Sequence, residues 1–336
     1  MVIGRNSRQN PAYCPICNCT AMKNNDNPNF QRRPNQFLPV LLKIIAGIAL
    51  LALIITAIFF VYKKNQSDKI TLKTIKKYWN VYDYEKVYES GKVFLQEQPY
   101  NNAALTYFGF ACFYLSVSQN DTSLSQEYLD ECINNLRLAL YEADKSAIPQ
   151  IQYFLGKAYF QKNVASSYYY SDLAIKYLSL AKQNGYSADD ISQYLGLCYD
   201  NLGMTMESLS SFLDALVLRE SDTLLLSVAK QYYKLKNYDA AEQYLYRIIN
   251  YYQNDDKKLE SKILLGNIYF EKNNYEQALQ MYNDVIEHYQ NSADAHYGIG
   301  LIYEKEGNMV KARAEWRQAL KIQVNHTGAL KKLSIY

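Results

Sequence analysis

The sequence is poor in the residues and motifs on which enzyme active sites depend. Its 336 residues include three histidines, and it contains no G-x-S-x-G nucleophile elbow, no glycine-rich phosphate loop and no H-E-x-x-H pair. The paired acids Asp189 and Asp190 precede an apolar run, where carboxylates are expected to stabilise the start of a helix. We therefore expect no enzymatic activity and no cofactor.

A concentrated basic surface is also missing from most of the chain. Residues 1–67 carry eight Lys and Arg against one Asp, a formal charge of +7, whereas residues 68–336 carry 28 Lys and Arg against 32 acids, a formal charge of −4. Nucleic-acid binding depends on a concentrated basic face. The charge distribution argues against a nucleic-acid partner and divides the chain into a basic N-terminal part and a mildly acidic remainder.

The acidic remainder is built of a repeat with a period near 34 residues. Taking Gly300 as a marker, the equivalent positions occur at intervals of 34, 37, 33, 40, 47 and 34, and they are Gly266, Ala229, Gly196, Gly156, Gly109 and Ile75. Such a period accommodates a helix, a turn, a second helix and a turn. The extra residues of the three longer intervals fall in polar stretches at 253–258, 161–171 and 116–126, which we expect to be loops.

The repeated residues resemble the tetratricopeptide repeat (TPR) family, whose pattern is W-x2-L-G-x2-Y followed by Gly, aromatic, Ala, aromatic, Ala and Pro. The last unit follows this pattern through Ile299, Gly300, Tyr303, Gly307, Ala312, Trp316 and Ala319. The opening Trp is missing throughout, and the closing Pro survives only as Pro99. The resemblance implies an all-α fold, a TPR-type α-solenoid of about seven helix-turn-helix repeats at residues 68–326, with residues 327–336 as a C-terminal capping helix.

An apolar run from Ile44 to Tyr62 contains no charged residue. Together with the preceding residues it is long enough to cross a hydrocarbon core of about 30 Å. We predict a transmembrane helix at residues 37–62 and a linker at 63–67, with Lys43, Lys63 and Lys64 near the headgroups. A cleaved signal peptide is the alternative, but the run begins late and no small-x-small cleavage site follows it.

The N-terminal segment, residues 1–36, is rich in Asn, Arg, Pro and Gln, so we expect a disordered tail. Its C-x2-C spacing could present two thiolates to a metal ion, yet no fourth ligand is nearby. We therefore predict no metal site and keep a site shared between two chains, or a thiol-dependent sensor, as alternatives. The thiols concerned are Cys14, Cys17 and Cys19.

Three further cysteines fall on or beside packing positions of the repeats, and we expect them to be small buried residues. They are Cys112, Cys132 and Cys198. If the repeats lie outside the cytoplasm, a disulfide between Cys112 and Cys132 is the alternative.

The short tail has five positive charges and one negative, which favours a cytoplasmic N-terminus, although six lysines also follow the apolar run. We accordingly expect a single-pass protein of a bacterial inner membrane with its repeats in the periplasm. The architecture resembles periplasmic scaffolds of secretion, pilus and spirochaete flagellar machines, and indicates a scaffold for protein–protein interaction and complex assembly. The alternative is an import or targeting receptor that faces the cytosol and binds apolar peptide segments.

The TPR resemblance also implies a peptide-binding groove, lined by the first helix of each repeat. An aromatic lining with scattered lysines suits an apolar or aromatic peptide that carries some negative charge. The residues carried over to this groove are Lys76, Trp79, Phe110, Phe113, Tyr153, Lys157, Phe160, Lys230, Tyr233, Asn267, Phe270 and Tyr297.

Overall fold

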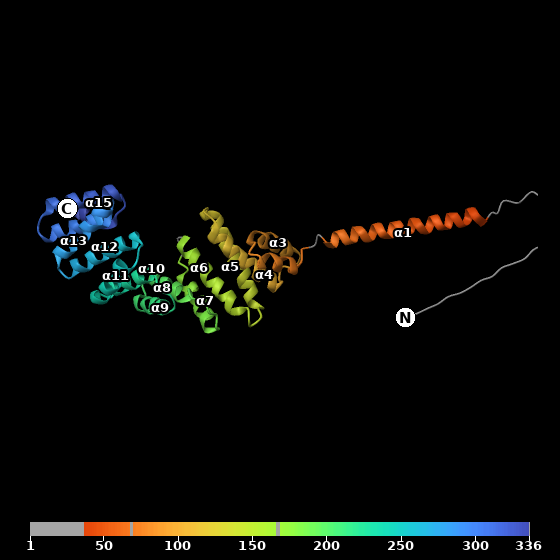
Figure 1. Ribbon diagram of the computed structural model, residues 1–336, viewed down its shortest axis with the longest axis horizontal. Helices are drawn as coiled ribbons and strands as arrows, with labels where there is room; N and C mark the ends of the chain where they lie inside the picture. Colours follow the sequence, from red (N-terminus) through yellow and green to blue (C-terminus); the bar gives the residue numbers. More distant parts are fainter. Residues whose placement is uncertain (1–36, 68–69, 166–168, 336) are drawn as a thin grey trace, which may run out of the picture. The chain divides into compact units, whose positions relative to one another are not determined.

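The computed structural model describes residues 37–67, 70–165 and 169–335, and within these ranges it contains sixteen helices and no strand. The chain divides into two units, Met1–Lys69 and Ile70–Tyr336. The first unit holds α1, and the second holds α2 to α16 (Figure 1).

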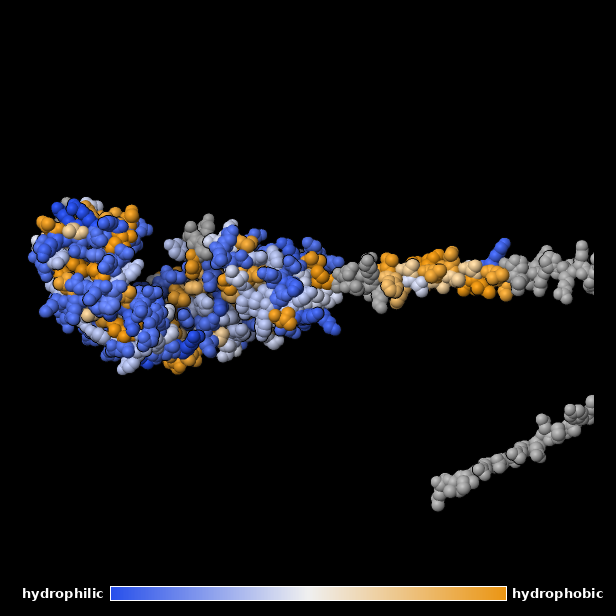
Figure 2. All heavy atoms as spheres, turned by 45° about the horizontal axis from the view of Figure 1, so that its top comes forward, coloured by the Kyte–Doolittle hydropathy of each residue, from blue (hydrophilic) through white to orange (hydrophobic). Residues whose placement is uncertain are grey.

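Helix α1 (Phe37–Ser67) is a long apolar helix. All side chains from Leu41 to Val61 are exposed, and this stretch is long and apolar enough to cross a membrane. Figure 2 shows α1 covered almost entirely by apolar residues, whereas the visible face of the repeat unit is mostly polar. The helix continues through residues 63–67, which we had expected to form a linker, because that segment contains no Pro or Gly to end it.

The repeat unit consists of seven helical pairs and a final single helix, which confirms the predicted all-α solenoid. The first helices of the pairs are α2 (Leu72–Asn80), α4 (Asn102–Ser118), α6 (Ile148–Ala165), α8 (Ile191–Asn201), α10 (Asp222–Lys234), α12 (Asp255–Glu271) and α14 (Ala293–Lys305). The second helices are α3 (Tyr84–Glu97), α5 (Thr122–Tyr141), α7 (Ser171–Gln183), α9 (Thr205–Leu218), α11 (Tyr238–Tyr251), α13 (Tyr275–His288) and α15 (Met309–Ile322). The last helix is α16 (Thr327–Ile335).

Each helix of the repeat unit packs mainly on its neighbours in chain order, and most first helices also contact the first helix of the next pair. The marker glycines explain how the two helices of a pair approach so closely. A Cβ atom placed on Gly300 would lie 2.4 Å from Nε1 of Trp316, and one on Gly266 would lie 2.5 Å from Cε1 of Tyr282. Both aromatic side chains are buried, so the large residue of the second helix fills the space that the glycine leaves.

The turn between the two helices of a pair recurs in five of the seven pairs. Seven residues after the marker, the backbone adopts a positive φ in five pairs, at Tyr82, Gly203, Lys236, Asn273 and Gly307. In four of these pairs the next residue is Asp or Asn, and its side chain accepts a hydrogen bond from the first turn of the second helix. One residue with a left-handed backbone conformation, followed by one residue whose side chain caps the next helix, therefore reverses the direction of the chain.

Two of the three long intervals between markers are taken up largely by longer helices, where we expected loops; in the third stretch, 161–171, α6 extends to Ala165 and residues 166–168 lie outside the described part of the chain. Within 116–126, α4 continues to Ser118 and α5 begins at Thr122, so that α5 reaches 20 residues. Within 253–258, α12 begins at Asp255 and reaches 17 residues. Capping explains both early starts, because Asp121 accepts a hydrogen bond from the Ser123 N–H at 2.8 Å and Asn254 accepts one from the Lys257 N–H at 3.2 Å.

Candidate partner-binding surface

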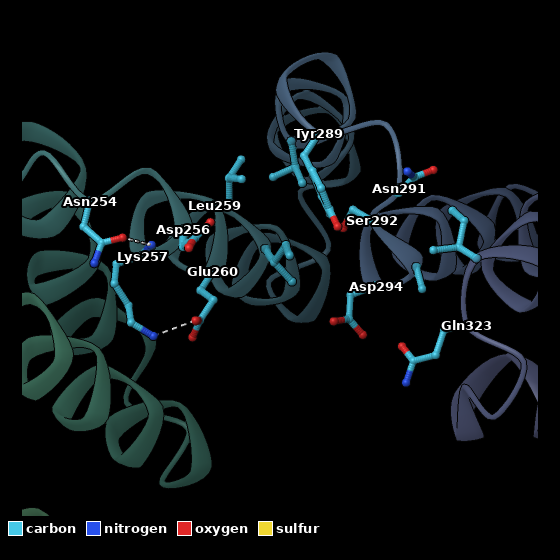
Figure 3. Close-up of a pocket in the computed structure, with 14 residues that line it drawn as sticks. Asn254, Asp256, Lys257, Leu259, Glu260, Tyr289, Asn291, Ser292, Asp294 and Gln323 are labelled. Carbon is cyan, nitrogen blue, oxygen red and sulfur yellow. Dashed lines mark hydrogen bonds and ion pairs between the residues drawn. The ribbon is translucent and has the colours of Figure 1, made fainter. Parts of the chain in front are cut away.

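A cavity of about 650 Å³ lies between the N-terminal turns of α12 and α14 and also receives residues from α13, α15 and the segments that follow them (Figure 3). Its apolar lining is formed by Leu259, Ile263, Val285, Tyr289, Ala293 and Ile322. Tyr289 is 53% exposed, so its ring remains accessible at the edge. The cavity has the size and the mixed lining of sites that receive a few residues of a ligand.

One polar wall of the cavity is provided by α12. Lys257 donates a hydrogen bond to Glu260 Oε1 at 2.7 Å, and Lys230 from α10 donates one to Oε2 at 3.2 Å. Desolvation tends to raise the pKa of Glu260, but the two ammonium groups outweigh it and the net pKa is lowered. This carboxylate therefore stays ionised and is already paired within the chain.

The opposite wall is fixed by a histidine. Asp294, on the first turn of α14, lies 3.1 Å from His326 Nε2, and the Ala329 N–H donates to His326 Nδ1 at 3.1 Å. Since Nδ1 accepts that bond, the ring proton resides on Nε2 and is donated to Asp294. The ring of Tyr297 packs on His326 with centroids 4.9 Å apart. The capping helix α16 is thereby tied to the cavity wall. In Figure 3, Glu260 is turned toward Lys257, and Asp294 lies on the other side of the cavity.

A smaller cavity of about 420 Å³ lies in the same register two repeats earlier. Asp190 and Gln193 line this cavity, and they lie six and three positions before the marker Gly196. Glu260 and Ile263 line the larger cavity and lie at the same two distances before the marker Gly266. The recurrence shows that neighbouring first helices leave a hollow at their N-terminal turns.

The predicted groove residues differ in how accessible they are. Phe110, Phe113 and Tyr153 are buried, because α4 and α6 pack directly on each other, with the rings of Phe110 and Phe154 4.3 Å apart. Lys76 and Lys230 are exposed. The half-buried residues are Trp79, Lys157, Phe160, Tyr233, Asn267, Phe270 and Tyr297.

Lys157 is enclosed by its own chain. Its ammonium lies 2.9 Å from Asp190 Oδ2 and 3.0 Å from the Tyr153 hydroxyl, and it sits over the rings of Tyr194, Tyr153 and Phe113 at 4.8, 5.0 and 5.6 Å. The Tyr153 hydroxyl donates to Asp190 at 2.8 Å, and burial, aided by this bond, raises the pKa of Tyr153. Because Lys157 and Lys230 are both paired with carboxylates, the groove does not offer them as free charges to an anionic peptide.

The cavity residues Glu260 and Asp294 are not among the expected groove residues. They occupy second positions of first helices, and Ile263 occupies a fifth position; the TPR resemblance assigns both positions to the groove. The signal that could have found them is the acid six positions before the marker, at Asp190, Glu260 and Asp294. The expected groove residues come instead from the fifth, ninth and twelfth positions.

The cysteine cluster predicted in the tail lies outside the residues that the structure describes. In the part that it does describe, no three His, Cys, Asp or Glu side chains are placed to hold a metal ion. Three thiols in this part are buried and free, as expected for packing residues, namely those of Cys112, Cys132 and Cys198.

Sequence comparison places the C-terminal repeats in a known class. Family models described as TPR repeat and tetratricopeptide repeat match residues 266–307 and 293–326. No curated protein matches the sequence.

Among solved structures, one TPR protein shares the fold, and others are similar over part of the chain. The C-terminal part of a TPR repeat-containing protein from Cytophaga hutchinsonii is similar over 78% of this chain and 98% of its own, with 14% identity and a TM-score of 0.55. YrrB, a TPR protein with an unusual peptide-binding site, covers 59% of this chain and 97% of its own at 23% identity and a TM-score of 0.44. MamA covers 53% and 97% at 20% identity and a TM-score of 0.41.

Proposed function

Because the chain is a tetratricopeptide-repeat protein, we propose that it is a membrane-anchored scaffold that binds other proteins and assembles a membrane-associated complex. Helix α1 serves as the anchor, since the stretch Leu41–Val61 is apolar throughout and wholly exposed. We further propose that the N-terminus is cytoplasmic and that the repeats lie in the periplasm of a bacterial cell, as in scaffolds of flagellar motors.

The cavity between α12 and α14 is the observation that carries this proposal. It combines an accessible apolar lining with the side chains of Glu260 and Asp294, which hydrogen bonds within the chain hold in place, an arrangement that can bury an apolar side chain of a partner and bind its polar backbone. The predicted groove residues Asn267, Phe270 and Tyr297 lie on the same two helices, α12 and α14. A peptide segment with an apolar anchor is the ligand that fits.

The proposal can be tested by replacing the most accessible aromatic residue of the cavity. We expect Tyr289→Ala to weaken partner capture from detergent-solubilised membranes by about 30-fold, the effect of losing an aromatic hot spot of about 2 kcal/mol. Tyr251→Ala is the matched control. Tyr251 is the last residue of α11, Tyr289 directly follows α13, and Tyr251 is 78% exposed. Equal capture by both variants would remove the cavity from the proposal.

The alternative function, a targeting receptor for apolar peptide segments that faces the cytosol, uses the same surface with the opposite topology. Protease treatment of intact cells and of spheroplasts separates the two. For the periplasmic scaffold, the repeats should be digested in spheroplasts while the N-terminal tail stays protected. For the cytosolic receptor, the repeats should be protected in both preparations.

A further inference from the structure

The outer face of α2, the first helix of the solenoid, carries three lysines and no acid. Lys73, Lys76 and Lys77 are exposed and follow the three-to-four spacing of one helix face. Ile75 on the opposite face is fully buried. In a longer solenoid the open face of a first helix would pack against a preceding repeat, so here the chain presents positive charge where another repeat could have docked.

These three lysines lie together on one helix face without an ion pair, whereas other unpaired lysines of this unit, such as Lys305, Lys321 and Lys331, lie on different helices. Within residues 70–165 and 169–335, none of the three lysines of α2 lies in a salt bridge. The lysines of this unit that do pair with carboxylates are Lys86, Lys157, Lys162, Lys182, Lys230, Lys234, Lys257, Lys262, Lys272 and Lys332. A surface made only for solubility would mix both signs of charge, as the rest of this unit does.

Exposed apolar side chains adjoin the lysines at the C-terminal end of α2. Val81 is 64% exposed and Tyr82 is 75% exposed, and Tyr82 occupies the left-handed turn position at φ 58°. A turn that holds an aromatic ring outward in this way suits the boundary between headgroups and acyl chains, where tyrosine is enriched.

The sequence between the apolar run and α2 is short. Nine residues, Lys63 to Thr71, separate Tyr62 from the first residue of α2, and nine residues span at most about 30 Å. The same segment adds Lys63, Lys64 and Lys69 against the single acid Asp68. The positive charge is therefore concentrated next to the predicted span, while the repeat region as a whole is acidic.

We propose that the lysine face of α2, together with Val81 and Tyr82, docks onto anionic phospholipid headgroups. The ammonium groups of Lys73, Lys76 and Lys77 bind the phosphates, and the turn inserts its apolar side chains between headgroups. The first repeat is thus held against the bilayer, and the remaining repeats project from a fixed base. This inference rests on the proposed membrane anchor.

The test uses the full chain in nanodiscs of phosphatidylcholine alone or with about one third phosphatidylglycerol. Amide hydrogen exchange of residues 72–82 should be slower in the anionic discs. We expect a factor of about five if one lysine binds the headgroups and about one hundred if all three do. The difference should disappear in the triple variant Lys73→Gln, Lys76→Gln, Lys77→Gln. It should persist in a control triple variant of exposed lysines elsewhere, Lys305→Gln, Lys321→Gln, Lys331→Gln.

Two results would overturn the docking while leaving the anchor intact. Equal exchange of residues 72–82 in both kinds of disc would show that headgroup charge is irrelevant. Slower exchange that survives in the α2 triple variant would show that these lysines are not the contact. A chain that fails to enter the discs would instead refute the anchor itself, and the docking with it.

Discussion

The close packing of Gly300 against Trp316 yields the sharpest prediction about stability. A Cβ atom at Gly300 would lie 2.4 Å from Nε1 and 2.5 Å from Cδ1 of Trp316, and 3.2 Å from the carbonyl oxygen of Ala312. Trp316 is fully buried, so its indole ring cannot move aside. We therefore expect that Gly300→Ala forces α14 and α15 apart.

Two opposing effects determine the size of the change. Replacing a glycine inside a helix by alanine normally stabilises the helix by about 1 kcal/mol. Overpacking a well-packed core costs about 1–3 kcal/mol, and contacts shorter than 3 Å with a rigid ring favour the upper end. The difference predicts that Gly300→Ala lowers the free energy of unfolding by about 1–2 kcal/mol.

A second substitution reverses the sign of the effect. The fifth repeat has Ala229 at the marker and Leu245 sixteen residues later, and both are fully buried. Gly300→Ala combined with Trp316→Leu reproduces that pair. In the Trp316→Leu background the new methyl group has room, so Gly300→Ala should be neutral or stabilising by up to about 1 kcal/mol.

Urea denaturation of the full chain in detergent, followed by far-UV circular dichroism, measures all four proteins of this cycle. The outcome that would refute the reasoning is a Gly300→Ala protein at least as stable as the wild type. A loss of equal size in both backgrounds would also contradict it, because the indole ring would then not be the cause.

Alkaline pH should unfold the repeats, since burial raises the pKa of Tyr153 and Tyr282 above the unfolded value of 10.0. The two tyrosines contribute fully to stability below about pH 10, and this contribution is lost as the pH rises from there towards their higher pKa in the folded protein. The urea concentration at the unfolding midpoint should therefore decrease above about pH 10, and it should decrease less steeply in Tyr282→Phe. A flat profile would contradict this. Replacing Asp190 by Asn leaves Lys157, only 15% exposed, without its carboxylate, and should cost about 1–2 kcal/mol in urea unfolding, whereas an unchanged midpoint would show that the pair contributes nothing. An alkylating reagent should leave the thiols of Cys112, Cys132 and Cys198 unmodified until the protein unfolds, as measured by mass spectrometry. Burial raises the pKa of all three thiols, to about 12 for Cys198. Prompt alkylation of the native protein would contradict this prediction.

The fold was largely predictable because its determinants are local and repeat. In the last four pairs, a small residue at the marker lies sixteen positions before a large one on the second helix, as at Gly266 and Tyr282. The lengths of α5 and α12 were missed because the capping groups of Asp121 and Asn254 start these helices inside stretches that read as polar loops.

The binding surface was less predictable, because accessibility depends on how neighbouring repeats pack. Phe110, Phe113 and Tyr153 occupy groove positions in the repeat pattern but are buried between long helices that the spacing does not reveal. Glu260 and Asp294 line the cavity between α12 and α14, yet in the sequence each resembles an ordinary acid near the start of a helix. Only the arrangement of α12 against α14 brings them to one site.

The central claim, that the cavity between α12 and α14 receives a partner protein, is tested most directly by photocrosslinking in living cells. A photoreactive amino acid would replace Tyr289 at the cavity or, as a control, Tyr141, which is 89% exposed at the end of α5. We predict a discrete crosslinked species from position 289 and none from position 141. Crosslinks from position 141 alone would contradict the account.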